Sequence, residues 1–283
     1  LDLGIMSQVR DLRNRERYGD ALGIMRPEVY PLIKFHKLPA NFTQLHVPIR
    51  TLLETLIDVG ELAEAKDLLR RIALDQTPVE YSEIAIELMN TYLRGENYED
   101  AVAVARRIPV EGKYSVNIRP ILDAADALRG AGLYSEVIPF YREIEKAVPE
   151  NLRDNVRMWL AYSLVLADKV DEGTKLIEDI PEPEKDERLF SLYKLLVGSR
   201  EYRTDNPGKA LDVLTRGFVR AQSSYSWVPE MLFLIGDCYR LANDPKAARN
   251  AWTEVSVLYP NSPWSTRAEA SLKDLPPPDQ AAN

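Results

Sequence analysis

Small residues recur along the chain at a nearly fixed spacing, and this feature constrains the fold more than any other. Each follows a polar turn and opens a new amphipathic segment; they are Ala21, Ala65, Ala101, Val137, Gly173, Ala210 and Ala248. The successive spacings are 44, 36, 36, 36, 37 and 38 residues. Because a period of this size is typical of architectures in which one short unit stacks on copies of itself, the sequence predicts a repeat protein.

Three further columns keep the same register as the small residues. Four residues later stand Met25, Leu69, Ala105, Tyr141, Ile177, Leu214 and Trp252. Seven residues later stand Ile72, Ile108, Ile144, Ile180 and Val255, with Glu28 and Gly217 as exceptions. Nine residues earlier stand Leu12, Leu56, Tyr92, Leu128, Leu164 and Tyr239, with Glu201 as the charged exception. Apolar residues at +4 and +7 predict an amphipathic helix, and the earlier segment shows the same periodicity.

Each repeat is therefore predicted to be a helix, a short turn and a second helix, in an all-α fold without strands. Two such helices cannot bury their apolar faces alone, so neighbouring pairs must stack into a solenoid. We place seven repeats near residues 1–44, 45–80, 81–116, 117–152, 153–188, 189–228 and 229–262 of one solenoid that covers residues 1–275. A capping helix is predicted at 263–275, with Ser262 as its N-cap and Pro263 in its first turn. Residues 276–283 are predicted to be a disordered tail.

Two repeats depart from the pattern. The long first spacing contains Pro27, Pro31, Pro39 and Pro48, which we expect to interrupt helical continuity. An extended second helix should be followed by a loop near residues 37–41. The sixth repeat lacks the aromatic residue of its column and has a long exit, "QSSYSWVP", so its joint is predicted to be looser or bent.

The last repeat resembles the tetratricopeptide family. Its Leu232, Ile235, Gly236, Tyr239, Ala248, Trp252 and Pro260 follow the family pattern W-x2-L-G-x2-Y, then A, F and P, with Leu232 replacing the Trp and Trp252 replacing the Phe. The resemblance implies a right-handed superhelical solenoid whose first helices line a concave groove for another protein or a peptide. It assigns the partner-binding groove to Arg50, Glu54, Asn90, Arg94, Asp126, Arg129, Tyr162, Tyr202, Asp237 and Arg240.

The closing segment "YPNSPWSTRAEASL" is similar to that of tetratricopeptide proteins of the bacterial envelope, of the outer-membrane assembly lipoprotein and Tol-Pal coordinator types. This similarity implies a location in the periplasm or cell envelope of a bacterium, with the cytoplasm as the alternative. The chain starts at Leu1 without Met, so we expect a processed or trimmed product from which a signal, an anchor or a further domain was removed. No apolar run has the length of a membrane span.

Composition and motifs give no sign of catalysis. The net charge of −8 argues against a protein that works by binding nucleic-acid phosphates. Cys238 is the only cysteine, has no nearby histidine, and is predicted to be a packed helix residue rather than a nucleophile. His36 and His46 lack metal-ligand spacing. Arg10, Arg13 and Arg17 alternate with acidic residues, which predicts a solvated, ion-paired face. We expect no catalytic residue, cofactor or metal.

The sequence therefore predicts a non-enzymatic scaffold or adaptor of a bacterial multiprotein assembly that binds a protein or peptide in its groove. One alternative is the tetratricopeptide region of a larger enzyme or a polysaccharide-handling protein, in which Trp159, Tyr162 and Tyr202 would stack on sugar rings. Another is a homo-oligomer that assembles through its end faces. Aromatic residues crowd the last sixty residues, where core and cap packing explains most of them and an interface the rest.

Overall fold

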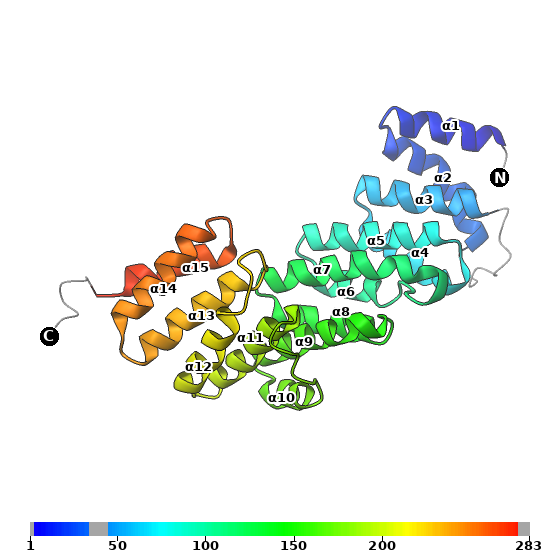
Figure 1. Cartoon of the computed structure of the whole chain (residues 1–283). Helices are drawn as coiled ribbons and strands as arrows, with labels where there is room; N and C mark the ends of the chain where they lie inside the picture. The colour runs from blue at the N-terminus through cyan, green and yellow to red at the C-terminus, as the bar shows by residue number, and fades with distance from the viewer. Residues whose placement is uncertain (1–2, 34–44, 277–283) are drawn as a thin grey trace. The chain divides into compact units, whose positions relative to one another are not determined.

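The structure is a computed structural model that describes residues 3–33 and 45–276. These residues form 15 α-helices and two short 3-10 helices, and no strand occurs among them (Figure 1). The predicted all-α fold class is confirmed. The expected loop near residues 37–41 and nearly all of the expected tail lie outside the described residues.

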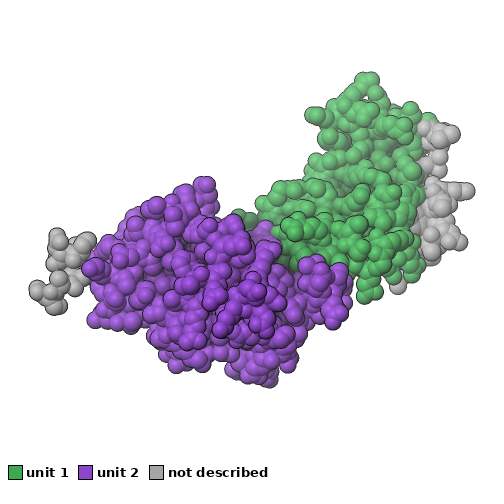
Figure 2. All heavy atoms as spheres, in the orientation of Figure 1, with its two compact units in different colours: residues 1–125 green, residues 126–283 purple. Residues whose placement is uncertain are grey.

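The helices group into two compact units, Leu1–Ala125 and Asp126–Asn283 (Figure 2). The first unit contains α1 (Leu3–Asn14), α2 (Tyr18–Ile33), α3 (His46–Val59), α4 (Leu62–Arg70), η1 (Leu74–Gln76), α5 (Val79–Arg94), α6 (Tyr98–Ala105) and η2 (Gly112–Asn117). The helix α7 (Ile118–Gly130) contains the boundary. The second unit continues with α8 (Tyr134–Glu145), α9 (Glu150–Leu166), α10 (Val170–Glu178), α11 (Arg188–Arg203), α12 (Pro207–Phe218), α13 (Val228–Leu241), α14 (Pro245–Leu258) and α15 (Pro263–Asp274).

One turn geometry joins the two helices of every pair. Its central residue has a positive φ, from 56° to 86°, and is Glu16, Gly60, Glu96, Gly132, Asp168, Asp205 or Asn243. The next residue donates its N–H to a carbonyl five residues earlier, as Asn97 does to Tyr92 at 2.9 Å. This left-handed residue and its hydrogen bond end the first helix as a Schellman motif does. The residue four positions further on, Ala101 in this pair, then forms the first hydrogen bond of the second helix.

The columns found in the sequence form the core. All seven small residues are buried, and so are all seven residues four positions later. At Gly236 a Cβ atom would lie 2.5 Å from Trp252 Cδ1, so the first and second helices of the last pair approach too closely for any larger residue. At Gly173, one of the seven small residues, a Cβ atom would lie 2.8 Å from Val165 Cγ2, so the predicted close approach of helices is seen at this position of the column.

Glu201 shows how the charged exception in its column is accommodated. The residue is only 4% exposed, and its carboxylate pairs with Arg200 Nη2 at 2.5 Å and Lys209 Nζ at 3.0 Å. A buried carboxylate needs such partners to offset its desolvation. Its backbone carbonyl still accepts the turn hydrogen bond from Asn206, at 2.9 Å.

One expectation about the irregular repeats is wrong. The helix α2 runs through Pro27 and Pro31 without interruption, because Met25 and Val29 keep its apolar face buried and this packing outweighs the hydrogen bonds that the prolines remove. Within the sixth pair the two helices pack closely, since a Cβ at Gly198 would lie 2.5 Å from Leu214 and one at Gly217 would lie 2.6 Å from Lys194. The looser joint expected at the exit of this repeat stays a prediction.

The helix α15 lies at the position of the predicted capping helix. The Ser262 hydroxyl accepts a hydrogen bond from the N–H of Trp264 at 3.2 Å, and Pro263 occupies the first turn. The Trp264 ring lies 5.2 Å from that of Phe233 on α13. Trp227, Phe233 and Trp252 are all buried, so packing accounts for these three of the aromatic residues that crowd this end.

Candidate functional site

In the first unit, the predicted groove residues form a half-exposed, charged surface on α3 and α5. Arg50 Nε lies 2.8 Å from Glu54 Oε1, one turn along α3. Arg13 on α1 also reaches this helix, 3.0 Å from Asp58 and 3.6 Å from Glu54. Arg13 is thus ion-paired, but with a neighbouring repeat and not only along its own helix.

The same surface continues on α5 with Asn90 and Arg94. The Arg94 side chain is 64% exposed and pairs with Glu87 at 2.9 Å on its own helix. Asn90 is half-buried. Ion pairs this exposed contribute little to stability, so these side chains can exchange partners at small cost.

In the second unit, two predicted groove residues are not available to a partner. Tyr162 on α9 is fully buried, and its hydroxyl donates a hydrogen bond to the carboxylate of Glu230 on α13. The Arg129 side chain is 13% exposed, because its guanidinium lies 3.6 Å from the centre of the Trp159 ring and donates to the Tyr141 hydroxyl at 3.3 Å. We therefore correct the assignment of Tyr162 and Arg129 to a binding groove. Asp126 is exposed, although it accepts a hydrogen bond from Tyr141 at 2.9 Å.

Glu230 is the centre of a buried polar cluster that the sequence did not predict. Burial raises the pKa of its carboxyl group to about 7, although the Tyr162 hydrogen bond and the charges of Arg129 and Arg267 act in the opposite direction. Burial, followed by the charge of Glu230, also raises the pKa of the Tyr134 hydroxyl. The only signal in the sequence was an acidic residue inside the apolar stretch "VPEMLFLIG". Glu230 on α13 thus interacts with side chains of α7, α8, α9 and α15, namely Arg129, Tyr134, Tyr162 and Arg267.

The remaining predicted groove residues gather where α11 meets α13. The Tyr202 hydroxyl donates to Asp237 Oδ2 at 3.4 Å, and burial raises the pKa of Asp237 to about 6. Arg240 is exposed one turn further along α13. Between them, Cys238 is fully buried, and burial raises the pKa of its thiol to about 12. The prediction that Cys238 is a packed residue is confirmed.

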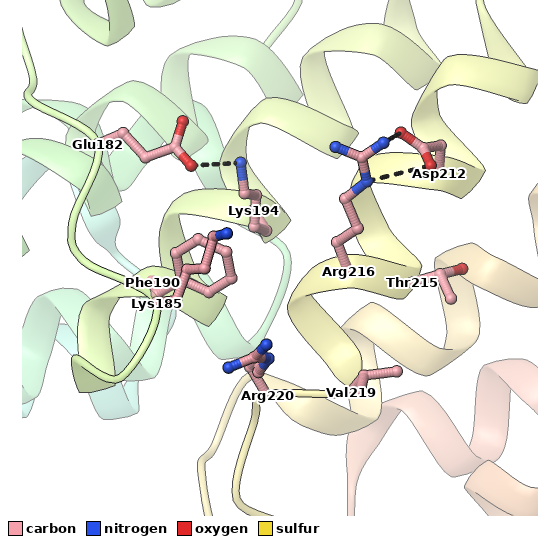
Figure 3. Close-up of a pocket in the computed structure, with 9 residues that line it drawn as sticks. All are labelled: Glu182, Lys185, Phe190, Lys194, Asp212, Thr215, Arg216, Val219 and Arg220. Atoms are coloured by element: carbon pink, nitrogen blue, oxygen red, sulfur yellow. Dashed lines mark hydrogen bonds and ion pairs between the residues drawn. The ribbon is translucent and has the colours of Figure 1, made fainter.

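A pocket that sequence reasoning missed opens beside α11 and α12. Its volume is about 490 Å³, and Figure 3 shows side chains from both helices and from the segment before α11 around it. The lining residues are Glu182, Lys185, Phe190, Lys194, Asp212, Thr215, Arg216, Val219 and Arg220. None of them was among the predicted groove positions, because the pocket faces the second helix of its repeat.

The part of the chain that the structure describes gives two further observations. No group of three or more His, Cys, Asp or Glu side chains there is placed to hold a metal ion. None of the helices described combines the length and the apolar character needed to cross a membrane. His46 lies at the start of α3 with its ring 4.9 Å from that of Tyr81, whereas His36 is outside the described residues.

The recurring turns and buried columns decide the type of fold. The described residues form an array of stacked helix–turn–helix pairs, the type of fold that the tetratricopeptide pattern of the last repeat predicts. No known family profile matches the chain, and no curated protein matches it. Among solved structures, it is similar to a tetratricopeptide repeat protein from Parabacteroides merdae, with 12% identity, a TM-score of 0.46, and coverage of 95% of this chain and 96% of that one.

Two other solved structures are similar over most of the chain. The PilF protein of Pseudomonas aeruginosa is 16% identical, with a TM-score of 0.40 and coverage of 81% of this chain and 98% of that one. YrrB, described as a tetratricopeptide protein with an unusual peptide-binding site, is 13% identical, with a TM-score of 0.35 and coverage of 86% and 98%.

Proposed function

We propose that the chain is a non-enzymatic scaffold that holds a protein or peptide on the first-helix surface of its first unit, formed by Arg50, Glu54, Asn90 and Arg94. The proposal rests on a difference in the exposure of groove side chains between the two units. The Arg50, Glu54 and Arg94 side chains of the first unit are 38%, 32% and 64% exposed, whereas in the second unit Tyr162, at the position equivalent to Glu54 and Asn90, is fully buried and the Arg129 side chain is 13% exposed. Solenoids use such surfaces, repeated from unit to unit, to bind extended partners.

Affinity purification with two matched baits tests this proposal. In the first bait, Arg50→Glu and Arg94→Glu reverse charges on the first-helix surface. In the control, Arg70→Glu and Arg106→Glu make the same change in charge at exposed positions at the ends of α4 and α6. We expect the first bait to lose a partner that both wild type and control retain, with all three proteins showing equal helical content by circular dichroism. Identical recovery by all baits would refute the surface assignment.

We further propose that this scaffold belongs to a multiprotein assembly of a bacterial cell envelope. The support is the similarity of "YPNSPWSTRAEASL" to the closing segments of envelope proteins. Cell fractionation with the tagged full-length gene product tests it. Recovery in the periplasmic or membrane fraction is the expected outcome, and recovery with cytoplasmic markers contradicts it.

Two of the three aromatic residues that suggested sugar binding are not accessible to a ligand. Of the three aromatic residues proposed to stack on sugar rings, Tyr162 is fully buried and Trp159 is 6% exposed. Only the half-buried Tyr202 remains accessible. Self-assembly through end faces remains a proposal that light scattering over a range of protein concentrations tests, since a mass that does not change from the monomer value excludes it.

A further inference from the structure

The pocket beside α11 and α12 is positively charged in a chain that is acidic overall. Its lining contains four cationic side chains, Lys185, Lys194, Arg216 and Arg220, and two anionic ones, Glu182 and Asp212. The whole chain has 36 basic and 44 acidic residues. The pocket therefore reverses the sign of the charge that the protein carries as a whole.

Two of the four cations are already paired inside the pocket. Lys194 Nζ lies 2.7 Å from Glu182 Oε1, and Arg216 Nη2 lies 2.9 Å from Asp212 Oδ2; both pairs are drawn in Figure 3. Lys185 and Arg220 form no ion pair with any residue that the structure describes, and both are exposed. The positive charges of Lys185 and Arg220 are therefore available to pair with a negatively charged ligand.

The pocket also has apolar surface next to these charges. Phe190 is 5% exposed and lies 5.1 Å below the Lys194 ammonium group. Val219, the residue that follows α12, is 73% exposed at the other side of the lining. A free phosphate ion has no apolar group to pack against this surface, whereas a peptide can place an aliphatic side chain against it.

We propose that this pocket binds an acidic peptide segment of a partner protein, with carboxylates on Lys185 and Arg220 and a neighbouring aliphatic side chain against the exposed Val219. Charge complementarity of this kind gives an interface its specificity and speeds association. The pocket shares no residue with the first-helix surface on α3 and α5. The inference is therefore independent of the proposed function and provides a second docking site.

A series of fluorescein-labelled octapeptides tests the proposal by fluorescence anisotropy with the full chain. Every peptide contains three Leu residues, and the other five positions contain zero, two or five Glu residues in place of Gln. We expect the affinity for the wild-type protein to rise with each increase in Glu content. Equal affinities across the series, or no binding by any peptide, would overturn the proposal.

Two variants locate the binding. Lys185→Glu combined with Arg220→Glu should weaken binding of the five-Glu peptide at least about tenfold, because two attractive contacts become repulsive. Lys175→Glu combined with Lys246→Glu is the matched control, since both residues are exposed in the same unit and outside the pocket. If the two double variants bind equally well, the pocket is not the site.

A third variant separates a peptide from a bare anion. Val219→Ser should weaken binding of the five-Glu peptide about threefold and leave competition by inorganic phosphate unchanged. If phosphate or a short single-stranded DNA displaces the peptide at concentrations at which a five-Glu competitor does not, the site recognises phosphate groups and the proposal is wrong.

Discussion

Five of the seven turns place a residue other than glycine in the left-handed conformation. Glu16, Glu96, Asp168, Asp205 and Asn243 have φ between 56° and 61°. Asn and Asp adopt this conformation more readily than other residues, whereas Glu gains no such local support. The turns at Glu16 and Glu96 are therefore held by the packing of the helices on either side and not by their own preference.

Replacement of Glu96 by glycine tests this conclusion. Because glycine has no Cβ, Glu96→Gly should raise the free energy of unfolding by about 1 kcal/mol in urea denaturation. Glu83→Gly, at an exposed position inside α5, should lower it by a similar amount, since glycine weakens a helix interior. Equal effects of the two substitutions would show that the turn at Glu96 carries no strain.

Glu230 makes the stability of the chain depend on pH in an unusual direction. Burial raises the pKa of this group to about 7 in the folded chain, against a reference value of 4.5. Between these pH values the folded state holds a proton that the unfolded state has released. The contribution of Glu230 is therefore complete below pH 4.5 and is lost as the pH rises through 7. Asp237, with its pKa raised to about 6, acts in the same direction.

Glu230→Gln should remove most of this dependence. The variant keeps an oxygen that accepts from Tyr162 but has no charge to bury, so we expect a stability close to wild type at pH 5 and up to about 3 kcal/mol higher at pH 8. The difference between the two urea denaturation curves, measured at both pH values, isolates Glu230 from the other carboxylates. A difference that is the same at pH 5 and pH 8 contradicts the assignment.

At the scale of helix pairs, glycine residues set how closely the first and second helices approach. In the last pair, Gly236 faces Trp252, which is fully buried and donates from its indole nitrogen to the Phe233 carbonyl at 3.1 Å. In the sixth pair, Gly198 faces Leu214 in the equivalent way. A large residue on the second helix thus occupies the volume that the first helix leaves open.

Gly236→Ala should destabilise the chain by about 1–3 kcal/mol, because the new methyl group overlaps the Trp252 ring in a packed core. Gly208→Ala is the control, since nothing lies within 4 Å of a Cβ at that position of α12, and it should leave stability unchanged or raise it by about 0.4–1 kcal/mol. Thermal denaturation followed by circular dichroism distinguishes the two. If Gly236→Ala has the same melting temperature as the wild type, the two helices can move apart to accommodate the methyl group without a loss of stability.

Across the whole molecule, burial is concentrated in the first helices of the second unit. Eight consecutive residues of α9, Met158 to Val165, are buried, and so are nine of α13, Val228 to Gly236. The helix α4 buries only Ala65, Leu68 and Leu69, along one face. Helices enclosed on several sides exchange amide hydrogens only through larger openings of the structure.

Hydrogen exchange followed by mass spectrometry should therefore show the slowest exchange in peptides of α9 and α13. Peptides of α4 and α6 should exchange faster by at least about tenfold. Equal protection along the chain would mean that the solenoid opens as a single cooperative body, and it would contradict the gradient expected from burial.

The sequence predicted the contacts that repeat and missed those that do not. Ala248, Trp252 and Gly236 stand in columns, so their packing could be derived from register alone. Tyr162 and Glu230 are 68 residues apart, on helices of different repeats, and no column of the repeat pairs them. The burial of Arg129 against Trp159 of the next repeat was missed for the same reason. The pocket at Lys185 and Arg220 was missed because it faces the second helix of its repeat.

The constant turn geometry has a consequence for how the chain can be lengthened. The residue with positive φ lies five positions before the small residue in all seven pairs, whereas the distance between pairs varies from 36 to 44 residues. Insertions are thus confined to the connections between pairs. One extra residue inside a turn would rotate the second helix by about 100° and expose its apolar face. Epitope tags, cleavage sites or fused domains therefore belong in the connections between pairs and not between the helices of a pair.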